Sequence, residues 1–213
     1  MLEELQYKLI RSRRRTLSIL VADGKITVRA PLRMADDAIM RFVESKRQWI
    51  EKQVARRDPR FDAVREGRAL LCGGELFPVC FGAERNGEDK GAFYFKSEAA
   101  VRSYLIRTRG GELLRKAGGL AGRFGFSPAQ ILLRDFKARW GSCDSSGIIK
   151  LNWRLLMLPP ELSGYVIVHE LCHLKVLAHS PAFWKEVGRL CADWRRLRRE
   201  LKNYAFLTNL YRR

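Results

Sequence analysis

The sequence predicts an α+β fold in which a β-rich N-terminal part precedes a helical part with a short sheet. Strand-like segments fill much of residues 1–96, whereas residues 97–213 are dominated by apolar side chains at helical spacing. All three histidines of the chain fall at the end of one of these helical segments and just beyond it. A chain of 213 residues can bury one compact core, or one core with a small appendage. We therefore expect two parts with a boundary near residue 96.

The N-terminal part is predicted to contain a β-hairpin and one long helix. Strand-like residues 17–21 and 25–30 flank the pair Asp23-Gly24, which is a strong hairpin signal. Residues 34–57 then carry apolar side chains at helical spacing, and Asp58-Pro59 ends this helix. Strand character returns at residues 70–81 and 92–96.

The C-terminal part is predicted to combine helices with two strands. A helix begins after Ser97 as N-cap and runs to about residue 123, although two Gly-Gly pairs weaken it. Strand-like residues 131–136 and 148–151 flank a loop. Prolines, which are tolerated in a first helical turn, open a helix at about 159–177 and another at Ser180-Pro181. A basic amphipathic helix closes the chain.

The net charge of +18 indicates possible anionic partners. Basic residues gather near both ends, at 11–15 and at 195–202. A field of this size attracts nucleic acid or other polyanions, although solvated basic faces would give the same composition. The composition leaves both interpretations open.

Cysteine usage and hydropathy predict a cytoplasmic protein without a membrane partner. No apolar run reaches the roughly 20 residues that cross a bilayer, and the first fifteen residues do not resemble a secretory signal. The five cysteines are scattered and include no CxxC pair. This pattern argues against a disulfide framework or a cysteine metal site.

The histidines form the pattern of a zinc site. His169 and His173 belong to an HExxH motif, and residues four apart leave the same face of a helix, where they can bind one zinc ion. His179 follows six residues later and can supply a third imidazole once the helix has ended. Glu170 is rotated by about 100° from His169, where it can hold and deprotonate a zinc-bound water. The motif predicts one zinc per chain with a fourth position open for catalysis.

Two alternatives to this zinc site must be weighed. Histidines at this spacing also occur in helices where they only pack or cap. The apolar residues 165–168 would partly bury them, however, and buried imidazoles need partners, which favours a metal. Glu186 or Glu200 could replace the third histidine as ligand. His179 is preferred because imidazole is the better zinc donor at a reachable distance.

Several segments around the motif together resemble the YgjP-like metallopeptidase family, small bacterial zincin-fold proteins related to SprT-like and WLM domains. These segments are RWGSC (139–143), LNWR (151–154), LPPE (158–161), YVIVHELCHL (165–174), HSPAFW (179–184) and, at the N-terminus, IRSRRRTLSI (10–19). The resemblance implies zinc bound by His169, His173 and His179, with Glu170 as the catalytic acid/base. Some family members have been assigned nucleotide pyrophosphatase activity, whereas SprT-like relatives act on proteins crosslinked to DNA.

Three other residues near the motif have candidate roles. An edge strand beside the metal helix can hold an extended substrate by backbone pairing. Arg139 would then stabilise an oxyanion or a phosphate, and Asn152 would orient a ligand or substrate group. A cap or a salt bridge is the structural alternative for Arg139. Trp184 is expected to pack behind His179 and fix its position.

The pattern favours a zinc-dependent hydrolase, and among hydrolases a metallopeptidase. Its substrates would be peptides or proteins, including DNA-associated proteins, and water activated by Glu170 would cleave the peptide bond. One alternative is a nucleoside triphosphate pyrophosphatase at the same site, which is less favoured because the chain has no Walker loop or carboxylate cluster for magnesium. Another is a non-catalytic nucleic-acid-binding module with a structural zinc, in which Glu170 would have no use.

Overall fold

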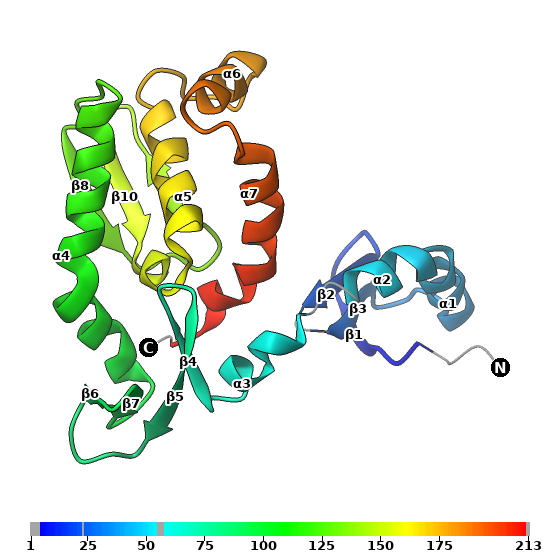
Figure 1. Cartoon of the computed structure of the whole chain (residues 1–213). Coiled ribbons are helices and arrows are strands. Elements are labelled where there is room, and N and C mark those ends of the chain that lie inside the picture. The colour runs from blue at the N-terminus through cyan, green and yellow to red at the C-terminus, as the bar shows by residue number, and fades with distance from the viewer. Residues whose placement is uncertain (1–4, 23, 55–57, 212–213) are drawn as a thin grey trace. The chain divides into compact units, whose positions relative to one another are not determined.

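The computed structural model describes residues 5–22, 24–54 and 58–211 (Figure 1). Its contacts divide the chain into two compact units, Met1–Arg60 and Phe61–Arg213. Both units contain helices and strands, so the predicted α+β class is confirmed. Within the residues described, no helix is long and apolar enough to cross a membrane.

The N-terminal unit is a three-stranded sheet with two helices. Its elements are β1 (Lys8–Ser12), β2 (Ser18–Ala22), β3 (Lys25–Pro31), α1 (Asp36–Ser45) and α2 (Arg47–Val54). The sheet order is β1-β3-β2, with β1 parallel and β2 antiparallel to β3. Inward-facing Ile26 and Val28 of β3 pack with Ile39, Val43 and Ile50 of the helices. This alternation of buried positions is the period-2 pattern that predicted the strand.

The predicted hairpin is present, whereas the predicted long helix is divided into two helices. Strands β2 and β3 pair antiparallel in the expected place, while Asp23 of the turn lies outside the described residues. The helix predicted over 34–57 is divided, because α1 ends at Ser45 and α2 begins at Arg47. The Ser45 hydroxyl donates to the carbonyl of Phe42 at 2.7 Å, and such local bonds compete with helix continuation. Residues 55–57 lie outside the described part.

The C-terminal unit contains two sheets and most of the helices. Its strands are β4 (Ala69–Cys72), β5 (Glu75–Phe81), β6 (Gly87–Asp89), β7 (Ala92–Phe95), β8 (Gln130–Arg134), β9 (Gly141–Cys143) and β10 (Ile148–Asn152). Its helices are α3 (Asp62–Arg65), α4 (Ala99–Arg123), α5 (Pro160–Cys172), α6 (Pro181–Leu190) and α7 (Trp194–Leu201), with 3-10 turns η1 (Pro59–Phe61, at the junction of the two units), η2 (Trp153–Met157) and η3 (Lys202–Asn209). The first sheet has the order β4-β5-β7-β6 and the second β8-β10-β9.

The division between the units differs from the boundary expected near residue 96. Buried Leu70 of β4 and Phe93 and Phe95 of β7 belong to the same hydrophobic core as Val101 and Leu105 of α4. Because these strands bury their apolar face against the helices, they are part of the C-terminal unit. Sequence patterns reveal which residues are apolar but not which partner covers them.

Helix α5 is the centre of the C-terminal unit. It contacts α4, α6, α7, β9 and β10, and α4 and α5 both lie against the sheet β8-β10-β9 (Figure 1). A helix covered on several sides is apolar around most of its circumference, and nine of its thirteen residues are buried. Beyond the exposed first turn, a polar side chain on α5 is therefore held in a packed environment.

Helix α4 remains continuous through its glycine pairs, over all 25 residues. Gly110 is buried, and a Cβ there would lie 3.1 Å from Leu133 Cδ1, so this glycine allows α4 to approach β8 closely. Packing thus outweighs the low helix propensity of glycine.

Candidate metal centre

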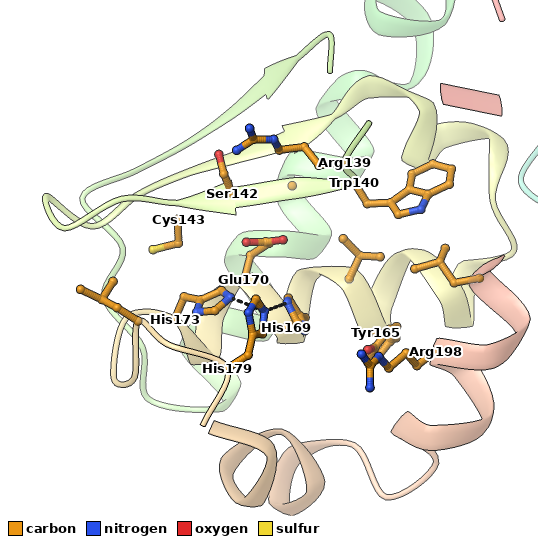
Figure 2. Close-up of a pocket in the computed structure, with 14 residues that line it drawn as sticks. Arg139, Trp140, Ser142, Cys143, Tyr165, His169, Glu170, His173, His179 and Arg198 are labelled. Carbon is orange, nitrogen blue, oxygen red and sulfur yellow. Dashed lines mark hydrogen bonds between the residues drawn. The ribbon is translucent and has the colours of Figure 1, made fainter. Parts of the chain in front are cut away.

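The three histidine side chains converge on one point (Figure 2). His169 lies in the last turn of α5, which ends at Cys172 rather than near residue 177, and His173 is the C-cap residue that follows. The chain then turns, with the amide of Lys175 donating to the carbonyl of Cys172, and returns His179 to the helix end. The His179 Nε2 atom lies 3.0 Å from Nε2 of His169 and 3.2 Å from Nε2 of His173.

This donor set fits a zinc ion. Zinc–nitrogen bonds of about 2.0–2.1 Å in tetrahedral geometry place the nitrogens about 3.3–3.4 Å apart, close to the separations found here. The Nδ1 atom of His173 lies 3.1 Å from the carbonyl oxygen of Val176, which can only accept, so Nδ1 carries the proton and Nε2 presents its lone pair. Three imidazole nitrogens that face one another at these distances can share one cation. In the described part of the chain, the three histidines are the group of metal-ligating side chains that could hold an ion.

Burial favours the neutral form of His169 and of His173. Burial lowers the pKa of His169 to about 3, and the neighbouring His173, His179 and Arg198 lower it further. Burial also lowers the pKa of His173. Neutral imidazole is the form that binds a metal, so the site is prepared for a cation at neutral pH.

Two aromatic residues of α6 pack against the imidazoles. The Phe183 ring stacks on His173 with centroids 4.4 Å apart, and the Trp184 ring stacks on His179 at 5.7 Å. Trp184 in turn stacks on Trp194 of α7 at 4.6 Å. Trp184 therefore lies in contact with His179, and its role in orienting that ring stays a prediction.

Glu170 lies beside the histidines in a buried position. Its side chain is 5% exposed, and burial raises its pKa to about 8, while the positive charge of Arg139 opposes this shift. Strand β9 passes directly over the carboxyl group: a Cβ on Gly141 would lie 2.7 Å from Glu170 Cγ and Oε1. The absence of a side chain at Gly141 therefore makes room for Glu170.

A cavity of about 420 Å³ opens onto the histidines. Arg139, Ser142 and Cys143 line it from the β9 side, and Tyr165 and Arg198 line it from α5 and α7 (Figure 2). Of the residues singled out from the sequence, the three histidines, Glu170 and Arg139 meet at this cavity, whereas Asn152 and Trp184 are not among its lining residues.

Asn152 is fully buried and bonded within the protein. Its amide donates to the carbonyls of Phe136 at 3.1 Å and Arg139 at 2.9 Å, and its carbonyl oxygen accepts from the amide of Arg154 at 3.2 Å. Any role of Asn152 in the site therefore acts through the position of the segment that carries Arg139.

The two glutamates considered as third ligands have other partners. Glu186 lies 2.8 Å from both the Lys175 ammonium and the Arg189 guanidinium, and Glu200 lies 3.0 Å from Arg196. These ion pairs hold both carboxylates away from the histidine cluster, which His179 completes.

Sequence reasoning missed Gly141, Tyr165 and Arg198 as cavity residues. Gly141 lay in a segment predicted as loop, and β9 forms only through its pairing with β10. Arg198 is exposed, but it follows Trp194 by four residues, so it lies at the border of the apolar face of α7. The spacing of four residues between Trp194 and Arg198 was the signal in the sequence that could have identified Arg198 as a cavity residue.

The match to a family model gives the class of this protein, a metallopeptidase. The chain matches the family model described as YgjP-like, metallopeptidase domain, over residues 15–204. It therefore belongs to the YgjP-like metallopeptidase family, as the resemblance indicated, and the family implies a metal cofactor and peptide or protein substrates.

Two further comparisons add no argument about the site. The chain is similar to the crystal structure of the metallopeptidase zymogen abylysin from Pyrococcus abyssi, at 23% identity over 42% of this chain and 90% of that chain, with a TM-score of 0.38. No curated protein matches the chain.

Proposed function

We propose that this protein is a zinc-dependent peptidase in which His169, His173 and His179 hold one zinc ion per chain. Glu170 is its catalytic acid/base. The observation that carries the proposal is the convergence of three imidazole nitrogens beside a buried carboxyl group in one open cavity. A structural zinc site would require neither the carboxyl group nor the opening.

The donor set supports zinc over harder cations. Magnesium and calcium prefer carboxylate and carbonyl oxygens, whereas three imidazoles are a common ligand set of catalytic zinc. Three protein ligands leave one coordination position for the reaction.

A bound zinc ion would polarise the scissile carbonyl and make a water molecule more acidic. Glu170 accepts the proton of the attacking water and then donates it to the leaving amine. Burial favours the protonated form of this side chain and the charge of Arg139 favours the carboxylate, and a general acid/base must take both forms in turn. The imidazoles are held in place by Phe183 and Trp184 throughout.

Variants at two glutamates of α5 test the catalytic part of the proposal. Glu170→Gln should retain zinc and lose peptide turnover by at least about 100-fold, because general acid–base catalysis contributes roughly that much. Glu161→Gln is the matched control, since Glu161 lies in the exposed first turn of the same helix. Equal turnover in both variants would remove Glu170 from the mechanism.

The substrate class is tested by offering one preparation a casein-type protein with and without DNA, and a panel of nucleoside triphosphates. We propose peptide or protein substrates, and the charge of +18 supports proteins bound to nucleic acid. Proteolysis that DNA stimulates would support protein substrates bound to nucleic acid. Release of pyrophosphate without proteolysis would contradict a peptidase and indicate a nucleotide hydrolase.

A further inference from the structure

We infer that Arg198 and Tyr165 form a carboxylate-binding subsite, so that this peptidase prefers substrates with a carboxylate close to the scissile bond. The inference rests on the proposed function and specifies its substrate. The carboxylate can be an acidic side chain or the free C-terminus of a peptide, because both present the same group.

The guanidinium group of Arg198 is held at the rim of the cavity. It lies over the Trp184 ring at 4.5 Å from the ring centroid, and Trp184 also stacks on His179. The same aromatic side chain thus contacts both the arginine and a histidine of the cluster. Figure 2 shows Arg198 and Tyr165 together at one end of the cavity, away from Ser142 and Arg139.

Arg198 has no carboxylate partner among the residues that the structure describes. Its neighbour Arg196, on the same helix, forms ion pairs with Glu161, Asp193 and Glu200. A guanidinium group binds a carboxylate through two parallel hydrogen bonds. Arg198 is therefore an exposed cation at the cavity that contacts Trp184 and has its bidentate donors available.

The Tyr165 hydroxyl provides a second donor at the same end. Tyr165 lines the cavity one helical turn before His169, and within the described part of the chain its hydroxyl has no hydrogen-bond partner. Arg198 is close enough for its charge to act on this hydroxyl. A carboxylate bound by Arg198 could accept from both groups.

No acidic side chain of the cavity lies beside Arg198. Glu170 is the single acidic side chain among the lining residues, and it interacts with Arg139 on the β9 side. The charge of Arg198, at the other end of the cavity, is therefore not offset by a lining carboxylate. An anionic group of the substrate is stabilised there and a cationic group is repelled.

A peptide carboxylate fits this site better than a triphosphate. One guanidinium matches one carboxylate, whereas phosphate chains are usually held by several cations together with magnesium. The described residues contain no cluster of carboxylates beside the cavity that could hold magnesium. The experiment would also detect binding of a nucleoside triphosphate.

The experiment measures binding, so that it does not depend on turnover. Zinc-loaded, full-length protein carrying Glu170→Gln is titrated with labelled peptides by fluorescence anisotropy at about 0.15 M salt. One peptide has an internal Glu and an amidated C-terminus, the second has Gln in its place, and the third has Gln and a free C-terminus. The Glu position is moved along the sequence.

We expect the best carboxylate peptide to bind about tenfold or more tightly than its neutral counterpart. Arg198→Ala should reduce this ratio to within about twofold, with zinc content retained, and Arg198→Lys should restore part of it. Arg195→Ala is the matched control, because Arg195 is an exposed residue of the same helix that lies over Trp194 at 4.5 Å without lining the cavity. It should keep the full ratio.

Turnover of the same peptides separates specificity from a structural role. With active protein, Arg198→Ala should raise KM for carboxylate substrates and leave kcat unchanged. An equal fall of kcat for carboxylate and neutral peptides would overturn the inference. So would a binding ratio that is unchanged in Arg198→Ala, or one that falls equally in Arg195→Ala. Arg198-dependent binding of a nucleoside triphosphate, without any preference among the peptides, would overturn it as well. Absence of hydrolysis by the wild type would contradict the proposed function, while the binding ratios would still decide the subsite.

Discussion

A methyl group added at Gly141 should displace the carboxyl group of Glu170 without touching the three histidines. The new Cβ would lie 2.7 Å from Glu170 Cγ and Oε1, whereas ordinary van der Waals contact begins at 3.4 Å. The carboxyl group must therefore move by about 0.7 Å, the difference between these distances. Because Glu170 is 5% exposed and β9 is paired with β10, neither partner can move freely.

The expected consequence of Gly141→Ala is a fall in kcat of about 10- to 100-fold, since misplacement of a reacting group by about 1 Å can cost roughly 100-fold. Overpacking should also lower the free energy of unfolding by about 1–3 kcal/mol. The zinc content should stay the same, because the added Cβ has no histidine atom among its three nearest neighbours. The assay is kcat on a fluorogenic peptide with the zinc-loaded variant, together with urea denaturation.

Gly118→Ala is the matched control, because a Cβ at this position of α4 meets no atom within 4 Å. It should keep full activity and raise stability by about 0.5–1 kcal/mol. Activity of Gly141→Ala within about twofold of wild type, with zinc intact, would refute the argument that β9 fixes the position of Glu170.

Two stability predictions follow from ion pairs outside the cavity. Arg154 is 0% exposed and binds a carboxylate and a main-chain carbonyl. Arg154→Ala should therefore lower the free energy of unfolding, measured by urea denaturation, by about 3 kcal/mol or more. Arg134 is exposed, and Arg134→Ala should lower it by about 0.5 kcal/mol or less. The pKa of Glu186 is lowered to about 2 by its bonds to Arg189 and Lys175, from an ordinary value near 4.5. Glu186 therefore contributes fully to the free energy of unfolding above about pH 4.5, and this contribution is lost as the pH falls towards 2. Glu186→Gln should lower the free energy of unfolding by about 1 kcal/mol or less at pH 7, and the variant and the wild type should become equally stable as the pH falls from 4.5 to 2. A stability difference that does not depend on pH would be inconsistent with the ion pairs.

Local sequence patterns could predict the features of this site that depend on a single element. The spacing of His169 and His173 places both on one face of a helix, and Ser180-Pro181 begins α6 where expected, with the Ser180 hydroxyl accepting from the amide of Phe183 at 3.4 Å. The order of the main strands and helices could be predicted for the same reason, because period-2 and period-3.6 patterns are local.

The features that depend on contacts between distant segments could not be predicted. Strand β9 exists through its pairing with β10, and the approach of Gly141 to Glu170 requires β9 and α5 to be packed together. Arg198 reaches the cavity because α7 packs on α5. Likewise, strands β4 and β7 join the helical core through long-range burial, which no pattern within 69–95 specifies.

The central claim is tested most directly by anomalous diffraction at the zinc absorption edge from crystals of the purified protein. We predict one peak per chain, about 2.0–2.1 Å from Nε2 of His169, His173 and His179. A peak elsewhere, a peak contacted by fewer than three of these imidazoles, or histidine side chains that point apart with no peak between them would contradict the account.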